Sequence, residues 1–148
     1  MDIKINQHSV VVFDLDDTLY NEIDYLKSAY RFIAKDLDPN GWKRLYSIMF
    51  SLYRSDVNVF NYLSETYGVE IKSLINIYRN HSPEIKLFDG ILDVLHAIKA
   101  NNGKLAIITD GRIKAQSAKL KALGVDDIFD KIIISEAIGT EKPDMANY

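Results

Sequence analysis

Two acidic side chains follow the first apolar run of the sequence. Val10 to Phe13 are β-branched or aromatic, and Asp14 and Asp16 come directly after them. Such a run predicts a buried β-strand. Two carboxylates in a strand-exit turn can have different environments, so their roles can differ. A solvated turn has the same composition, so the pair alone does not assign a function.

Two further polar clusters follow later apolar runs. Thr109, Asp110 and Gly111 end the run that begins at Leu105, and Lys142 comes shortly after the run from Ile132 to Ser135. The carboxyl ends of parallel strands share one edge of a sheet, so these side chains are expected to converge with the two aspartates.

The remaining patterns are mostly helical. Four stretches between residues 20 and 83 repeat apolar residues at helical spacing, and two more helices run from Gly90 to Asn101 and from about Ala115 to Gly124. Strands that alternate with helices predict an α/β fold with a parallel sheet. We expect a core formed by residues 1–19 and 84–148, and an inserted helical cap at residues 20–83.

Composition narrows the classes of function. The 148 residues carry 18 basic and 21 acidic side chains without long runs of one sign, so neither a nucleic-acid partner nor a membrane partner is expected. Cysteine is absent, which excludes disulfides and thiolate chemistry. His8, His81 and His96 lack metal-ligand spacing and are predicted to lie at the surface. The charged N-terminus and the short first apolar run favour a cytoplasmic location.

The three polar clusters resemble the motifs of one family. Asp14-Leu15-Asp16-Asp17-Thr18 after its strand looks like the first motif of haloacid dehalogenase-like phosphatases, Ile107 to Gly111 resembles the second, and Gly139 to Asp144 the third. The resemblance implies a Rossmann-like parallel three-layer sandwich with an α-helical cap inserted after the first strand.

The resemblance also implies a role for each site residue. Asp14 would be the nucleophile that forms an aspartyl-phosphate, and Asp16 would protonate the leaving oxygen and then activate water. Thr109, Asp110 and Gly111 would bind phosphate oxygens, and Lys142 would offset their charge. Mg²⁺ would bind Asp14 and the carbonyl of Asp16.

An acid at position 16 favours phosphate-ester hydrolysis, because dehalogenating relatives lack that acid. The helical cap resembles those of enzymes that act on small soluble phosphates such as sugar phosphates and nucleoside monophosphates. A dehalogenase is the second choice, and nothing in the sequence favours a phosphosugar mutase. A phospho-accepting receiver domain also combines acids with a lysine, but the helical insertion argues against it.

The family's fourth motif, one or two acids after a fourth strand, is not found before Tyr148. We therefore expect a core that lacks its last strands, with the first strand as an open apolar edge. Such an edge predicts a homo-oligomer. The alternative is a weakly active or inactive relative that only binds phosphate or a protein partner.

Overall fold

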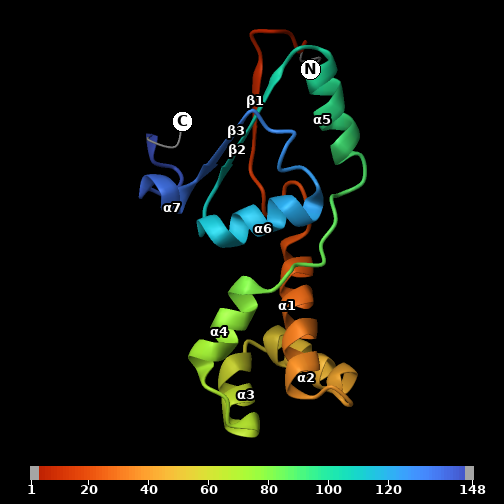
Figure 1. Cartoon of the computed structure of the whole chain (residues 1–148), viewed down its shortest axis with the longest axis vertical. Coiled ribbons are helices and arrows are strands. Elements are labelled where there is room, and N and C mark those ends of the chain that lie inside the picture. The colour runs from red at the N-terminus through yellow and green to blue at the C-terminus, as the bar shows by residue number, and fades with distance from the viewer. Residues whose placement is uncertain (1–3, 146–148) are drawn as a thin grey trace. The chain divides into compact units, whose positions relative to one another are not determined.

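The computed structural model describes residues 4–145 and confirms the α/β class (Figure 1). Over these residues the elements are, in chain order, β1 (Val10–Phe13), α1 (Glu22–Leu37), α2 (Trp42–Arg54), α3 (Val59–Tyr67), α4 (Ile71–Asn80), α5 (Ile91–Ala100), β2 (Lys104–Thr109), α6 (Ile113–Leu123), β3 (Lys131–Ile134) and α7 (Ser135–Ile138). No helix in the described part is long and apolar enough to cross a membrane.

The chain divides into two compact units. One unit joins Met1–Glu22 to Ile85–Tyr148 and holds the sheet; the other, Ile23–Glu84, is helical. In Figure 1 the helical unit is the orange to light-green group, α1 to α4. The predicted role of residues 20–83 as a cap stays a prediction.

The sheet has the order β1-β2-β3, with both neighbouring pairs parallel. Phe13 pairs with Ile107, and Thr109 pairs with Ile134, so the three carboxyl ends share one edge. β2 is the central strand and is buried from Leu105 to Thr109. This register places the polar residues that follow each strand side by side.

β1 is less buried than its apolar sequence predicts. Val10 is 64% exposed and Val12 is 48% exposed, whereas Val11 and Phe13 are partly buried. Successive side chains of a strand point to opposite faces, so one face of β1 packs on the unit and the other does not. Phe13 packs edge-on against Phe129, with the ring centroids 6.3 Å apart. The prediction of a fully buried strand was therefore wrong for Val10 and Val12.

The helical unit has its own apolar core. Positions three and four apart on α1 meet residues from α2, α3 and α4, as the 3.6-residue period requires. The buried members of this core are Tyr30, Ile33, Ala34, Leu45, Met49, Val59, Leu63 and Leu74. Trp42 is partly buried against them.

His81 was predicted to lie at the surface, and this was wrong. Its side chain is 5% exposed at the end of α4, with its ring centroid 4.9 Å from that of Tyr25. Its Nδ1 lies 2.8 Å from the Tyr78 carbonyl and its Nε2 3.1 Å from Ser28 Oγ. A carbonyl oxygen can only accept, so Nδ1 carries the proton. Burial lowers the pKa of His81.

A third difference concerns the third strand. The sequence predicts that Ser135 belongs to it, but β3 ends at Ile134 and Ser135 opens the short helix α7. The Ser135 hydroxyl accepts a hydrogen bond from the Gly111 backbone, a contact between loops that local sequence patterns do not reveal.

Candidate active site

Lys142 joins the loops that follow the three strands. Its Nζ lies 2.9 Å from Asp14 Oδ1, and its backbone N–H donates to Asp110 Oδ1 at 3.0 Å. Residues from the ends of β1 and β2 and from the segment after β3 therefore meet, as their spacing predicts. The structure brings together all six predicted site residues: Asp14, Asp16, Thr109, Asp110, Gly111 and Lys142.

Asp14 is oriented by its neighbours and remains accessible. Its Oδ1 accepts the Leu15 backbone N–H at 2.8 Å, and the Leu15 side chain is fully buried and anchors the turn. The Asp14 side chain is nevertheless 42% exposed. An accessible carboxylate beside an ammonium group has the surroundings required of a nucleophile that attacks an anionic phosphate.

Asp16 is held much more tightly than Asp14. Its Oδ1 accepts hydrogen bonds from Lys119 Nζ at 2.7 Å and from the Tyr20 hydroxyl, and its Oδ2 accepts from Gln116 Nε2 at 2.9 Å. Burial by itself raises the pKa of Asp16, but the donors Lys119, Tyr20 and Gln116 together outweigh burial and hold the pKa below its ordinary value. Both oxygens of the Asp16 side chain are therefore held in place by hydrogen-bond donors.

Gln116 also contacts the phosphate-binding residue predicted at the end of β2. Its Nε2 donates to Thr109 Oγ1 at 2.6 Å, and both side chains are almost fully buried. Gly111 has φ +141°, and a Cβ atom there would lie 3.1 Å from Gln116 Cγ and Cδ. Glycine at this position therefore leaves space for the Gln116 side chain.

Lys119 and Gln116 were not identified from the sequence. They lie on the buried face of α6 together with Leu120 and Leu123. Polar residues at helical spacing within an apolar face were the signal that could have found them, because an unpaired lysine is almost never buried.

The Gly111 backbone N–H has a hydrogen-bond partner from α7. Its N–H donates to Ser135 Oγ at 2.9 Å. Glu136, the next residue of α7, accepts the Ile113 N–H at 2.7 Å and so caps the start of α6. A phosphate oxygen that bound the Gly111 N–H would have to displace Ser135.

Asp17 and Tyr20 brace the same turn. Asp17 has φ +55°, and its side chain accepts the Glu22 backbone N–H at 2.8 Å. Tyr20 is fully buried and donates to Asp16. Tyr20 therefore packs in the interior, where its hydroxyl fixes a site residue.

The oxygen atoms at this edge of the sheet can provide some of the ligands of a Mg²⁺ ion. Mg²⁺ is commonly held by one or two carboxylates together with water and substrate phosphate. Asp14 and the carbonyl of Asp16 are of the correct type, and Asp14 is accessible. Residues 4–145 contain no group of three acidic or histidine side chains that could hold a metal ion. The residues thus fit a Mg²⁺ ion that keeps water or phosphate at its other positions.

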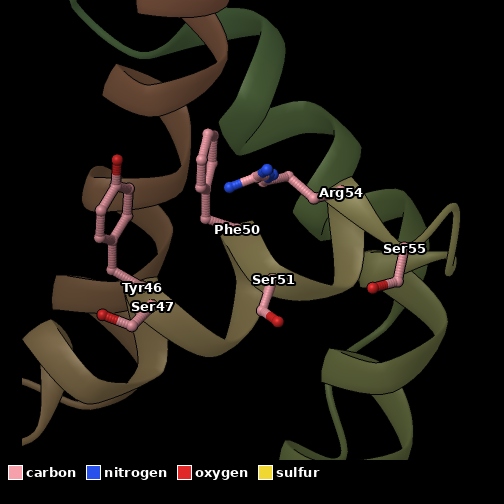
Figure 2. A pocket seen from close by; sticks show the side chains of 6 residues that line it. All are labelled: Tyr46, Ser47, Phe50, Ser51, Arg54 and Ser55. Atoms are coloured by element: carbon pink, nitrogen blue, oxygen red, sulfur yellow. The ribbon is translucent and has the colours of Figure 1, made fainter.

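A separate pocket lies in the helical unit, where Figure 2 shows its lining. Its volume is about 490 Å³, and all six lining residues belong to α2 or follow it directly: Tyr46, Ser47, Phe50, Ser51, Arg54 and Ser55. The Tyr46 and Phe50 rings stack with centroids 6.2 Å apart, and the Arg54 side chain points toward Phe50 in Figure 2. No predicted site residue lines this pocket.

Known sequences resemble this chain over most of its length. The family model described as haloacid dehalogenase-like hydrolase matches residues 11–148. A glyceraldehyde 3-phosphate phosphatase of Methanocaldococcus jannaschii is 29% identical over 90% of this chain and 64% of its own length. The pyrimidine 5'-nucleotidase YjjG of Escherichia coli is 35% identical over 90% of this chain and 65% of its own length. This chain thus spans just under two thirds of the length of these relatives.

Solved structures share the fold. The HAD-type hydrolase YfnB of Bacillus subtilis, bound to magnesium, superposes with a TM-score of 0.62 at 20% identity and covers 97% of this chain and 70% of its own. The L-2-haloacid dehalogenase of Xanthobacter autotrophicus gives 0.56 at 16% identity, over 95% of this chain and 62% of its own.

Proposed function

Because the chain belongs to the haloacid dehalogenase-like hydrolase family, we propose that it is a phosphatase that forms an aspartyl-phosphate on Asp14. One observation carries the proposal. An accessible Asp14 is paired with Lys142, while Asp16, two residues further along the chain, is fixed by three donors. The two carboxylates thus have the different surroundings that two different roles require.

The reaction has two steps in this proposal. An Asp14 oxygen attacks phosphorus, the bond from phosphorus to the ester oxygen breaks, and the leaving oxygen takes a proton from Asp16. Water then attacks phosphorus, its proton passes to Asp16, and the electron pair of the broken acyl–phosphate bond returns to the Asp14 carboxylate. Asp16 ends the cycle protonated and ready for the next leaving group.

Thr109 and Lys142 serve the phosphoryl group. The Thr109 hydroxyl donates to a phosphoryl oxygen, with the backbone of Asp110 and Gly111 beside it, and the Lys142 ammonium offsets negative charge. Asp14 and the Asp16 carbonyl would hold Mg²⁺, which supplies charge neutralisation between nucleophile and phosphate when it is bound.

A small phosphorylated metabolite is the proposed substrate class. Relatives named as a glyceraldehyde 3-phosphate phosphatase and a pyrimidine 5'-nucleotidase support it, and so does the acid at position 16. The choice between a sugar phosphate and a nucleoside monophosphate would be made by the helical unit acting as a cap. A cytoplasmic location, where such metabolites occur, belongs to the same proposal.

Hydrolysis of p-nitrophenyl phosphate tests the function. Wild type, Asp14→Asn and Lys142→Met are compared with and without Mg²⁺, and Lys131→Met at the exposed start of β3 is the matched control. We expect activity that needs Mg²⁺, is lost in Asp14→Asn, falls strongly in Lys142→Met and is kept in Lys131→Met. Turnover that persists in Asp14→Asn would contradict the proposal.

A second function stays open because residues 4–145 hold no cluster of three acidic or histidine side chains for a metal ion. The site would then bind phosphate without turning it over. Isothermal titration of the folded chain with inorganic phosphate separates the two: binding without hydrolysis of any ester in a panel of phosphorylated metabolites favours the binding protein.

We also propose that two copies pair through β1. Support comes from the position of β1 at the edge of the sheet and from the exposure of Val10 and Val12. An apolar edge strand offers unpaired backbone groups to a second strand.

A further inference from the structure

Two residues of α6 that do not belong to the three motifs contact the proposed acid–base residue. Lys119 Nζ lies 2.7 Å from Asp16 Oδ1, and Gln116 Nε2 lies 2.9 Å from Asp16 Oδ2. Each oxygen of the carboxylate therefore has its own donor from the same helix. The Lys119 and Asp16 side chains are 8% and 21% exposed, so solvent screens this pair weakly.

The burial of Lys119 argues for a specific role. Taking an ammonium group out of water is costly, and the cost is offset only by a well-placed partner. An exposed lysine at this position would avoid the cost, as Lys114 and Lys121 do on the same helix. A structural role alone would be served equally well by an apolar side chain of the same length, since buried ion pairs often add little to stability.

Gln116 has a defined orientation that follows from chemistry. An ionised carboxylate can only accept hydrogen bonds, so the amide nitrogen of Gln116 must face Asp16. The same nitrogen donates to Thr109 Oγ1 at 2.6 Å. Because Thr109 accepts this bond, its own hydroxyl proton is directed elsewhere, and its present contact is the Asp110 carbonyl at 3.5 Å. A phosphoryl oxygen would accept a stronger hydrogen bond from the Thr109 hydroxyl than the Asp110 carbonyl does at that distance.

We propose that Lys119 and Gln116 are positioning residues for hydrolysis of the aspartyl-phosphate. Both residues hold the Asp16 carboxylate where it takes the proton of the attacking water. Gln116 also turns the Thr109 hydroxyl toward the phosphoryl group. The inference rests on the proposed function. In the step concerned, the water oxygen bonds to phosphorus, the bond from phosphorus to Asp14 breaks, and the proton moves to Asp16.

A second observation links the two contacts. Gln116 and Lys119 are three positions apart on one face of α6, and the N-terminus of that helix is capped by Glu136 from α7. Glu136 follows Ser135, which binds Gly111. The helix that holds Asp16 is therefore linked through α7 to the same loop that is proposed to bind phosphate.

Pre-steady-state kinetics test this inference. The ester is p-nitrophenyl phosphate with Mg²⁺, because p-nitrophenolate leaves without a proton, so the first step does not require Asp16 as an acid. Lys119→Met and Gln116→Leu are expected to keep the rate of the first p-nitrophenol release, lower the steady-state rate by about tenfold or more, and accumulate acid-stable phosphoenzyme. Lys119→Arg, which keeps the donor, is expected to restore most of the steady-state rate.

The controls are Lys121→Met and Ser117→Ala, exposed positions on the same helix. Both are expected to match wild type. Circular dichroism of every variant establishes that it is folded. Should the first release and the steady state fall together in folded Lys119→Met and Gln116→Leu, or should neither rate change, the inference is wrong.

Failure of the underlying function gives a different result. If the folded wild-type chain releases no p-nitrophenol at any Mg²⁺ concentration, the phosphatase proposal falls, and the positioning role falls with it. If wild type turns over and the variants are unaffected, the phosphatase stands and the positioning role alone is overturned.

Discussion

Asp14 and Asp16 differ in their hydrogen-bond partners far more than their closeness in the chain suggests. Asp14 is 42% exposed and meets Lys142, whereas Asp16 is largely enclosed by donors from α6 and Tyr20. The turn after β1 gives them different neighbours: Asp14 contacts Lys142 from the segment after β3, and Asp16 contacts Gln116 and Lys119 of α6. This separation is the basis for assigning them different roles.

Tyr20→Phe tests how much one of these donors matters. The Tyr20 ring is fully buried and stays in place, so the change removes only the hydroxyl that donates to Asp16. We expect the free energy of unfolding, measured with urea, to fall by about 0.5–1.5 kcal/mol, the net worth of one hydrogen bond. Tyr67→Phe, an exposed tyrosine at the end of α3, is the control and should leave stability unchanged. Equal stability in both variants would show that the Tyr20 hydroxyl does not hold Asp16.

At the scale of elements, Asp130 ties α5 to the sheet. It accepts the Leu105 N–H at 2.9 Å at the start of β2, and Lys99 Nζ of α5 lies 2.9 Å away. The Leu105 N–H and the Lys99 ammonium lower the pKa of Asp130 from 3.8 to about 2. A carboxyl whose pKa is lower in the folded chain stabilises it above the unfolded value and loses that effect as pH falls.

Asp130→Asn should therefore lower the free energy of unfolding at pH 7. The difference in this free energy between variant and wild type should shrink as the pH falls from about 4 to about 2. Urea unfolding across this range measures it. Asp127→Asn, in the exposed turn before β3, serves as the comparison and should track wild type at every pH. A difference that is constant with pH would exclude the charge of Asp130 as the cause.

The helical unit contains a buried hydrogen-bonded pair, His81 and Ser28, at the end of α4. Since Nδ1 of His81 donates to the Tyr78 carbonyl, Nε2 accepts from the Ser28 hydroxyl, whose oxygen also accepts the Glu84 N–H at 2.8 Å. Ser28→Ala removes both bonds and leaves His81 Nε2 buried without this donor. We expect a loss of about 1–3 kcal/mol in urea unfolding. Ser47→Ala, an exposed serine of α2, should cost much less, and equal losses would contradict this assignment.

Much of this organisation could be predicted from the sequence. Local periodicity predicted the three strands and most of the helices. The shared edge of a parallel sheet predicted that the polar residues after the strands would lie close together, and the structure brings them together. Burial of His81 and the contacts of Lys119 and Gln116 depend on side chains from distant elements. Local patterns therefore did not reveal them.

At the scale of the whole molecule, the open edge of β1 predicts self-association. Val12→Lys places a charge on the exposed face of that edge and is expected to convert a dimer into a monomer in light scattering. Val57→Lys is a matched control, since Val57 is 47% exposed and Val12 48%, but Val57 lies in the helical unit. A monomeric wild-type chain would show that the edge does not pair.

The most direct test of the account is chemical trapping of the covalent intermediate. The chain is mixed with p-nitrophenyl phosphate and Mg²⁺, quenched, reduced with borohydride, and digested for peptide mass spectrometry. Borohydride converts an acyl-phosphate of aspartate into homoserine, so the account predicts homoserine at position 14 and at no other aspartate. Turnover with an unmodified Asp14, or with the label at another carboxylate, would contradict it.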